Sequence, residues 1–282
     1  MMKMNKNKTK AIIVIILLSI LCILLLGFMI SVMCGVLPIW KFNFGTTKVS
    51  DALAFEEVYD TSFQTIDIDV SFGNIEVLPS NDSQVHVAIY SDYRLFDVND
   101  TKSSLAIIFS EKEGFHFSFP KSRDLVRIYL PDTSNIKVLL TTDLGDVKVD
   151  DFPNTSFDIT ADLGDISVGQ ADVLSVDSDL GDVSIGEVCD LTVKSDQGNI
   201  EVTKVSEKVS IDTDLGDISI EKLNLIKDSK IVLSLGDLEI TNITNAYVDS
   251  TTDLGTVDIK NNNREAPYVL TVENDLGDVK IG

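Results

Sequence analysis

One phrase, Asp-Leu-Gly-Asp-Val or a close variant of it, recurs eight times between Leu144 and Asp278. The glycines that mark the phrase are separated by 19, 17, 17, 18, 20, 19 and 22 residues, the length of one supersecondary unit that stacks on its neighbours. An earlier copy, in which Gly73 is followed by asparagine, precedes these eight. The period predicts a solenoid with turn glycines at Gly73, Gly145, Gly164, Gly181, Gly198, Gly216, Gly236, Gly255 and Gly277.

Apolar and polar residues alternate on both sides of each glycine, as expected for strands, whose side chains point alternately to the two faces. In the third copy the apolar positions from Leu174 to Leu180 share one parity, whereas Val183 and Ile185 take the other. The Gly-Asp pair therefore predicts a corner that adds one residue, with the aspartate bonding to amides of its own turn. We expect leucine, Leu180 included, to stack over leucine in a continuous core.

The fold class predicted from this pattern is all-β, a single-stranded parallel β-solenoid or β-helix over residues 61–282. Regular repeats occupy 142–282, whereas the period is lost within 61–141, which we interpret as irregular N-terminal coils. Strand-like runs remain there at residues 85–90, 105–109, 115–119 and 126–130.

The final coil is expected to form the open end of the stack, because Val279 and Ile281 complete a core strand there. Lys280 places a charge beside that edge, which favours a monomer over a dimer that joins two open ends.

The N-terminal segment predicts one membrane-spanning helix at residues 11–37, because ~20 consecutive apolar residues suffice to cross a bilayer. A basic tail, residues 1–10, precedes the helix, and only Lys41 follows it closely. The positive-inside rule then places the tail in the cytoplasm and residues 61–282 outside, with 38–60 as a juxtamembrane linker. The sequence therefore predicts a single-pass cell-membrane protein with an extracytoplasmic domain.

Charge narrows the range of partners. The chain has 45 acidic and 23 basic residues, for a net charge of -22. A protein that binds nucleic acid or anionic lipid headgroups needs clusters of lysine and arginine, so both are excluded as partners of the extracytoplasmic domain. The partners that remain are the membrane around the helix and an unidentified envelope component, either cationic or a glycan.

The hydrophobic segment, the run from Val126 to Pro131 and the repeated Leu-Gly-Asp-Val turns resemble a bacterial family of β-strand repeats catalogued as putative adhesins, a domain of unknown function. The resemblance covers about Phe63 to Gly282. It implies a cell-envelope surface module that is adhesin-like or associated with envelope stress. The family carries over no catalytic residues.

No catalytic residues and no cofactor are predicted. The aspartates that lie two before the glycine recur at equivalent positions, whereas an active site needs one constellation of unlike groups. His86 and His116 alternate with apolar residues and are expected to face solvent. A carbohydrate-active β-helix enzyme is the weaker alternative, and a scaffold that polymerises through solenoid ends is the other.

A calcium ladder is the alternative interpretation of the aspartates. Stacked coils would place equivalent carboxylates ~4.8 Å apart, and such a column attracts cations that take oxygen ligands. However, Asn74, Asn199 and Thr256 fill the position after the glycine without a charge. We therefore favour structural turns over a cation ladder formed by Asp143, Asp146, Asp162, Asp165, Asp179, Asp182, Asp214 and Asp217.

Overall fold

The computed structural model describes residues 49–60, 63–92, 96–109, 123–131 and 136–282. Every regular element in these residues is a β-strand, which confirms the all-β class. The predicted helix at 11–37, the tail at 1–10 and the strand-like run at 115–119 lie outside the described residues. Within the described ranges no helix is long and apolar enough to cross a membrane.

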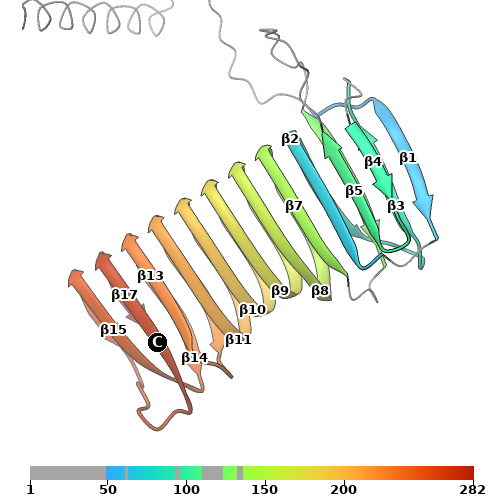
Figure 1. The fold of residues 1–282 in the computed structure, drawn as a ribbon. Helices are drawn as coiled ribbons and strands as arrows, with labels where there is room; N and C mark the ends of the chain where they lie inside the picture. Colours follow the sequence, from blue (N-terminus) through green and yellow to red (C-terminus); the bar gives the residue numbers. More distant parts are fainter. Residues whose placement is uncertain (1–48, 61–62, 93–95, 110–122, 132–135) are drawn as a thin grey trace, which may run out of the picture. The chain divides into compact units, whose positions relative to one another are not determined.

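Four long strands form the middle of the stack, and each pairs in parallel with the next along its whole length. They are β8 (Val147–Leu163), β9 (Ile166–Leu180), β10 (Val183–Gln197) and β11 (Ile200–Leu215). First halves pair with first halves and second halves with second halves, so the coils build two parallel layers (Figure 1). The layers continue through β12 (Ile218–Asn224), β13 (Ser229–Leu235) and β14 (Leu238–Thr244).

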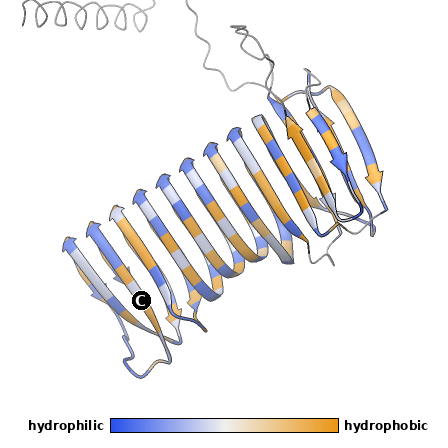
Figure 2. Cartoon of the chain, viewed as in Figure 1, coloured by the Kyte–Doolittle hydropathy of each residue, from blue (hydrophilic) through white to orange (hydrophobic). Residues whose placement is uncertain are grey.

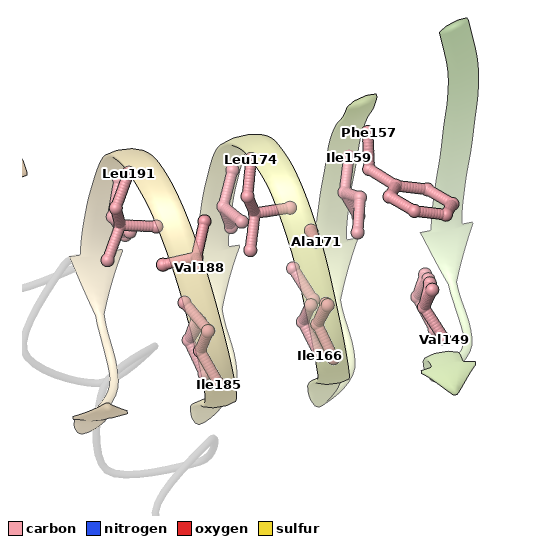
Figure 3. Packing of buried hydrophobic residues seen from close by; sticks show 14 of the residues in the cluster. Val149, Phe157, Ile159, Ile166, Ala171, Leu174, Ile185, Val188 and Leu191 are labelled. Atoms are coloured by element: carbon pink, nitrogen blue, oxygen red, sulfur yellow. The ribbon is translucent and has the colours of Figure 1, made fainter. Parts of the chain in front are cut away.

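The core lies between the two layers. In Figure 3, Leu174 and Leu191 come from one layer and Ile166 and Ile185 from the other, and all four are at most 2% exposed. Their alternation with polar residues produces the banded strands of Figure 2. Burial of each such side chain stabilises the fold by ~1.5–3 kcal/mol. Because each coil stacks in register, the core continues from one coil to the next.

The strand β2 (Thr65–Pro79) supplies the first copy of the repeat. It pairs in parallel with β7 (Lys137–Leu144) and with the start of β8. On its other side it pairs in parallel with β5 (Ser104–Phe109) and β6 (Asp124–Leu130). These two strands form a further coil, although the residues around them do not follow the repeat.

The N-terminal part also contains antiparallel strands, which the prediction of irregular parallel coils did not include. They are β1 (Leu53–Tyr59), β3 (Val85–Tyr90) and β4 (Phe96–Asp100). A tight turn reverses the chain between β4 and β5, where the Thr101 hydroxyl oxygen accepts the amides of Ser103 and Ser104. Since β1 lies inside the predicted linker at 38–60, that prediction is wrong for residues 53–59.

The order of the last coils differs from their order in the sequence. Two strands follow β14, namely β15 (Ala246–Leu254) and β16 (Val257–Ile259), and then β17 (Tyr268–Leu276) and β18 (Val279–Ile281). However, β17 pairs with β13 on one side and β15 on the other, and β18 lies between β14 and β16. The coil of Gly277 is therefore inserted between the coils of Gly236 and Gly255.

The prediction that Val279 and Ile281 form the open end is consequently wrong. Both are buried between coils, and the Lys280 ammonium bonds to Glu239 at 2.7 Å instead of guarding an edge. The two coils have interchangeable apolar patterns, so periodicity gives no information about which of them is outermost.

The outermost coil is capped by its own connection to β17. The Asn262 side chain accepts the Val248 amide at 2.9 Å and donates to the Val248 carbonyl at 2.8 Å, which satisfies part of the backbone edge of β15. Ser250 and Thr252 occupy inward positions of this coil. Their hydroxyl oxygens are buried and have no hydrogen-bond partner among the described residues.

Candidate functional site

The repeated corner is formed by four residues, Asp179 to Asp182 in the coil that joins β9 to β10. Gly181 has a φ of 156°, and a Cβ on this residue would clash with the carbonyl oxygen of Gly164 in the adjacent coil. Glycine is therefore required both by φ and by the close stacking of successive corners. The nine glycines predicted to form turns all lie in this column of corners.

The aspartates that follow the glycine bond between coils. Asp165 Oδ1 accepts the backbone amide of Asp182, and Asp182 Oδ1 accepts that of Asn199. The same bond, at 2.8 to 3.2 Å, is made by Asn74, Asp146, Asp165, Asp182, Asn199, Asp217, Asp237 and Asp278. We call this set the following column. The prediction that these side chains bond within their own turn is corrected, because each acceptor is used by the next coil.

This ladder explains which residues occupy the following column. Asn74 and Asn199 have the same acceptor oxygen as an aspartate, so they fit at the same place. Thr256 lies in the outermost coil, so no further coil among the described residues supplies an amide to its side chain. Its own amide and hydroxyl both donate to Asp278 Oδ1 at 2.8 Å. These two bonds, the amide first, lower the pKa of Asp278.

The aspartates that precede the leucine form a second set of carboxylates, which we call the preceding column. Its members are Asp143, Asp162, Asp179, Asp196, Asp214, Asp253 and Asp275, and all are exposed. Desolvation raises the pKa of Asp162, followed by repulsion from Asp179 and Asp143. Within the ranges described above, none of these seven forms an ion pair.

The calcium alternative depends on how many carboxylate oxygens are left for a cation. Calcium takes six to eight oxygens, yet one oxygen of each aspartate in the following column already accepts an amide. No three or more His, Cys, Asp or Glu side chains among the described residues are grouped so that they could hold a metal ion. Calcium binding by these columns therefore stays a question for experiment.

The leucine between these two columns is not a core residue, contrary to the sequence-based expectation. Leu180 is 48% exposed, whereas Leu174, on the same strand, is fully buried. The inward run ends at Ser178 and resumes at Val183, because the chain turns the corner between them. The leucine column, as we call it, consists in spatial order of Phe72, Leu144, Leu163, Leu180, Gln197, Leu215, Leu235, Leu276 and Leu254.

Histidine and cysteine provide little reactive chemistry in the described residues. His86 is partly exposed and bonds to Asp82 at 3.0 Å, and this bond is the largest cause that lowers the pKa of Asp82 to about 2. His116 lies outside the described residues. Cys189 is half-buried at the opposite corner of the coil, beside Lys204.

The fold and the repeated corner define a class of protein, a two-layer parallel β-solenoid with an acidic edge. The chain belongs to the Toastrack DUF4097 family, whose profile matches residues 63–282. The resemblance stated from the sequence is thereby confirmed. A comparison with curated proteins found no match.

The solved structures that match this chain include three bacterial proteins. A putative adhesin of Bacteroides fragilis is 18% identical, with 83% of this chain and 99% of that chain covered and a TM-score of 0.44. A putative lipid binding protein of Parabacteroides distasonis is 12% identical, with coverage of 84% and 100% and a TM-score of 0.37. A putative cell adhesion protein of Clostridium sporogenes is 10% identical, with coverage of 80% and 98% and a TM-score of 0.27.

Proposed function

We propose that this chain is a non-catalytic binding module held outside the cytoplasm by an N-terminal membrane anchor. The observation that carries the proposal is the repeated corner, which presents the same apolar and acidic side chains coil after coil along one side of the stack. Such a surface suits an extended partner, which can make the same contact several times. The Toastrack DUF4097 match supports the fold on which this proposal rests.

The absence of catalysis is supported by the way the titratable groups are distributed. An active site brings unlike groups together in a concave pocket, whereas the carboxylates here form parallel rows on a convex edge. A hollow of about 200 Å³ lies beside Asn262 and Val248, below the ~300–1,000 Å³ typical of ligand pockets. It is lined mainly by asparagine, aliphatic and proline side chains.

A scaffold that polymerises through its ends is the second candidate, but no feature of the described residues favours it. At one end Asn262 occupies part of the free backbone edge of β15. At the other end the parallel coils give way to antiparallel strands. The two ends therefore lack complementary edges, which disfavours head-to-tail stacking.

Protease treatment of intact cells tests the proposed location. In a host without an outer membrane, trypsin added outside should remove the domain that follows Lys41, because the four lysines of the tail hold the N-terminus inside. A cytoplasmic marker protein in the same cells should remain intact. Protection of the domain until the cells are lysed would refute the extracytoplasmic placement.

A further inference from the structure

The leucine column is the main apolar feature of the described surface. Leu163, Leu180, Leu215, Leu235 and Leu276 are 45 to 48% exposed, and Leu254 in the outermost coil is 66% exposed. These six account for half of the large apolar side chains that are exposed in the described residues. Since neighbouring coils are in register, the six belong to one stripe, which Gln197 interrupts between Leu180 and Leu215. Contiguous apolar stripes on a protein surface mark interaction sites.

The corner itself does not require this leucine. Gln197 occupies the same register position in β10, between Leu180 and Leu215, and the backbone ladder passes through it unchanged. Gly181 donates to the Gln197 carbonyl at 3.1 Å, as Gly164 does to Leu180. A polar side chain therefore satisfies the fold at this position, and the repeated leucine needs another explanation.

The charges of the domain are distributed unevenly between the two corners. At the opposite corner Lys204 pairs with Glu187 at 2.9 Å, and Lys227 pairs with Glu207 at 2.8 Å and Asp190 at 3.3 Å. At the leucine corner, among the described residues, the preceding column has no ion pair and the following column has only the contact of Asp146 with Arg123 at 3.8 Å. The leucines thus run between two rows of carboxylates in which, among the described residues, only Asp146 has a cation beside it.

We propose that the leucine column and the two flanking carboxylate columns form a docking stripe for a cationic amphipathic helix of a partner protein or peptide. The inference deepens the proposed binding function, on which it rests, by naming the site and the chemistry of the partner. Leucine side chains would receive the apolar face of the helix, and the carboxylates on each side would receive its lysine or arginine side chains.

Charge excludes the other occupants of an apolar stripe. The only charged residues before Thr47 are five lysines, so residues 47–282 carry 45 acidic and 18 basic side chains, a net charge of -27. A second copy of the chain would bring a second pair of carboxylate rows against the first, and an anionic lipid surface would be repelled in the same way. A cationic partner alone gains from both the leucines and the aspartates.

The spacing of the coils favours a helix over an extended peptide. Adjacent coils lie ~4.8 Å apart, whereas alternate residues of a strand recur every ~6.6–6.8 Å. One turn of an α-helix rises 5.4 Å, so the turns of a helix that lies along the stripe nearly match the spacing of the coils. From Leu144 to Leu254 the stripe spans about seven intervals, or ~34 Å, which corresponds to a helix of roughly 22 residues.

The test uses the full chain in nanodiscs of zwitterionic lipid and a fluorescent 22-residue peptide with leucine on one face and lysine on the flanks. Fluorescence anisotropy, with the signal of empty nanodiscs subtracted, gives the dissociation constant. We expect saturable binding that weakens with salt and no binding of the same peptide with glutamate in place of lysine. Combined L163Q, L180Q, L215Q and L235Q changes, which copy the residue found at position 197, should weaken binding at least tenfold.

A matched control changes two exposed apolar residues at the opposite corner, V173Q and I226Q, which are 43% and 42% exposed in the wild type. The affinity of this control for the peptide should stay within twofold of the wild type.

Equal binding by the four-leucine variant, or no binding by the wild type, overturns the inference. Self-association of the wild type through the leucines also overturns it. If the four-leucine variant melts early, D179N, D196N and D214N together must weaken binding instead. The two tests can fail separately. If the peptide does not bind but trypsin still cleaves the domain on intact cells, the docking stripe is refuted and the proposed extracytoplasmic location is not.

Discussion

Leu174 and Leu180 lie on the same strand, yet only Leu174 belongs to the core. Leu174→Ala should lower the free energy of unfolding by about 2–5 kcal/mol, because it leaves a cavity between the layers. Leu180→Ala should cost about 1 kcal/mol, because half of that side chain already contacts water. Urea unfolding of the two variants measures the difference. Equal losses would show that the corner leucine is buried after all.

The alternation of side chains predicted most of the buried residues of the repeat, but not the fate of the corner leucine. Parity placed Leu174, Val176, Ser178 and Val183 inside, and all four are buried. The parity rule failed at Leu180, because the corner changes the direction of the backbone as well as the parity of the inward-facing residues. The sequence does contain one signal of exposure, since Gln197 stands in the same column and a buried glutamine without partners would be costly.

At the level of the coil, the ladder of side-chain acceptors predicts that charge at the following column is dispensable. Asp165→Asn should leave the melting temperature unchanged or raise it slightly, because the amide oxygen still accepts the Asp182 amide and one repulsive charge is removed. Asp165→Ala should lower the free energy of unfolding by about 0.5–1.5 kcal/mol, the net contribution of a hydrogen bond.

The same variant tests calcium. If the carboxylates held calcium in the folded state, millimolar calcium would raise the melting temperature of the wild type by mass action, and Asp165→Asn would reduce that rise. We expect equal melting temperatures in calcium and in chelator for both proteins. A calcium-dependent rise in the wild type alone would restore the cation ladder.

The acidic columns also predict how stability depends on pH. Desolvation and neighbouring carboxylates raise the pKa of Asp162 and of Asp69 in the folded protein, so the folded state binds their protons more readily than the unfolded state. Stability should therefore rise as the pH falls from 7 through these raised pKa values. Two other aspartates oppose this change: the pKa of Asp82 is lowered to about 2, and the pKa of Asp278 is also lowered. The stability that these two carboxylates contribute is lost as the pH falls through their lowered pKa values.

The expected result is a maximum in the melting temperature at mildly acidic pH. Thermal melts between about pH 7 and pH 3 measure the profile, and Asp162→Asn should flatten its upper limb. A melting temperature that falls steadily from pH 7 would contradict the assignment of repulsion to the columns.

At the scale of the whole molecule, the inserted coil can be checked by disulfide formation in a background in which Cys22, Cys34 and Cys189 are all changed to serine. Lys230 on β13 is paired in register with Thr271 on β17, and Thr271 with Asp249 on β15. Lys230→Cys with Thr271→Cys should form a disulfide, because neighbouring strands lie ~4.8 Å apart, within bonding range. Lys230→Cys with Asp249→Cys should not, since a whole coil separates them. Mobility on non-reducing gels tells them apart, and the reverse result would restore the sequential stack.

The period predicted that coils stack but not which coil is last. The distinction depends on the connections: Asn245 turns the chain with a φ of 64°, and the Asn262 side chain bonds to the edge of β15. Neither feature alters the apolar pattern, so the period contains no information about the order of the last coils. The antiparallel strands near the N-terminus were not predicted for a similar reason. Short turns set the direction of these strands, and an apolar run looks the same whether its strand is parallel or antiparallel.

The inserted coil has a consequence for the order in which the protein is made. A chain that emerges from its N-terminus can add each earlier coil as soon as that coil is synthesised, since its partner already exists. When β15 emerges, the strand that will separate it from β13 has not yet been made. β15 must then either stay unpaired or pair with β13 first and be displaced later by β17. This end of the solenoid therefore closes in one late step, after residues 268–281 have arrived.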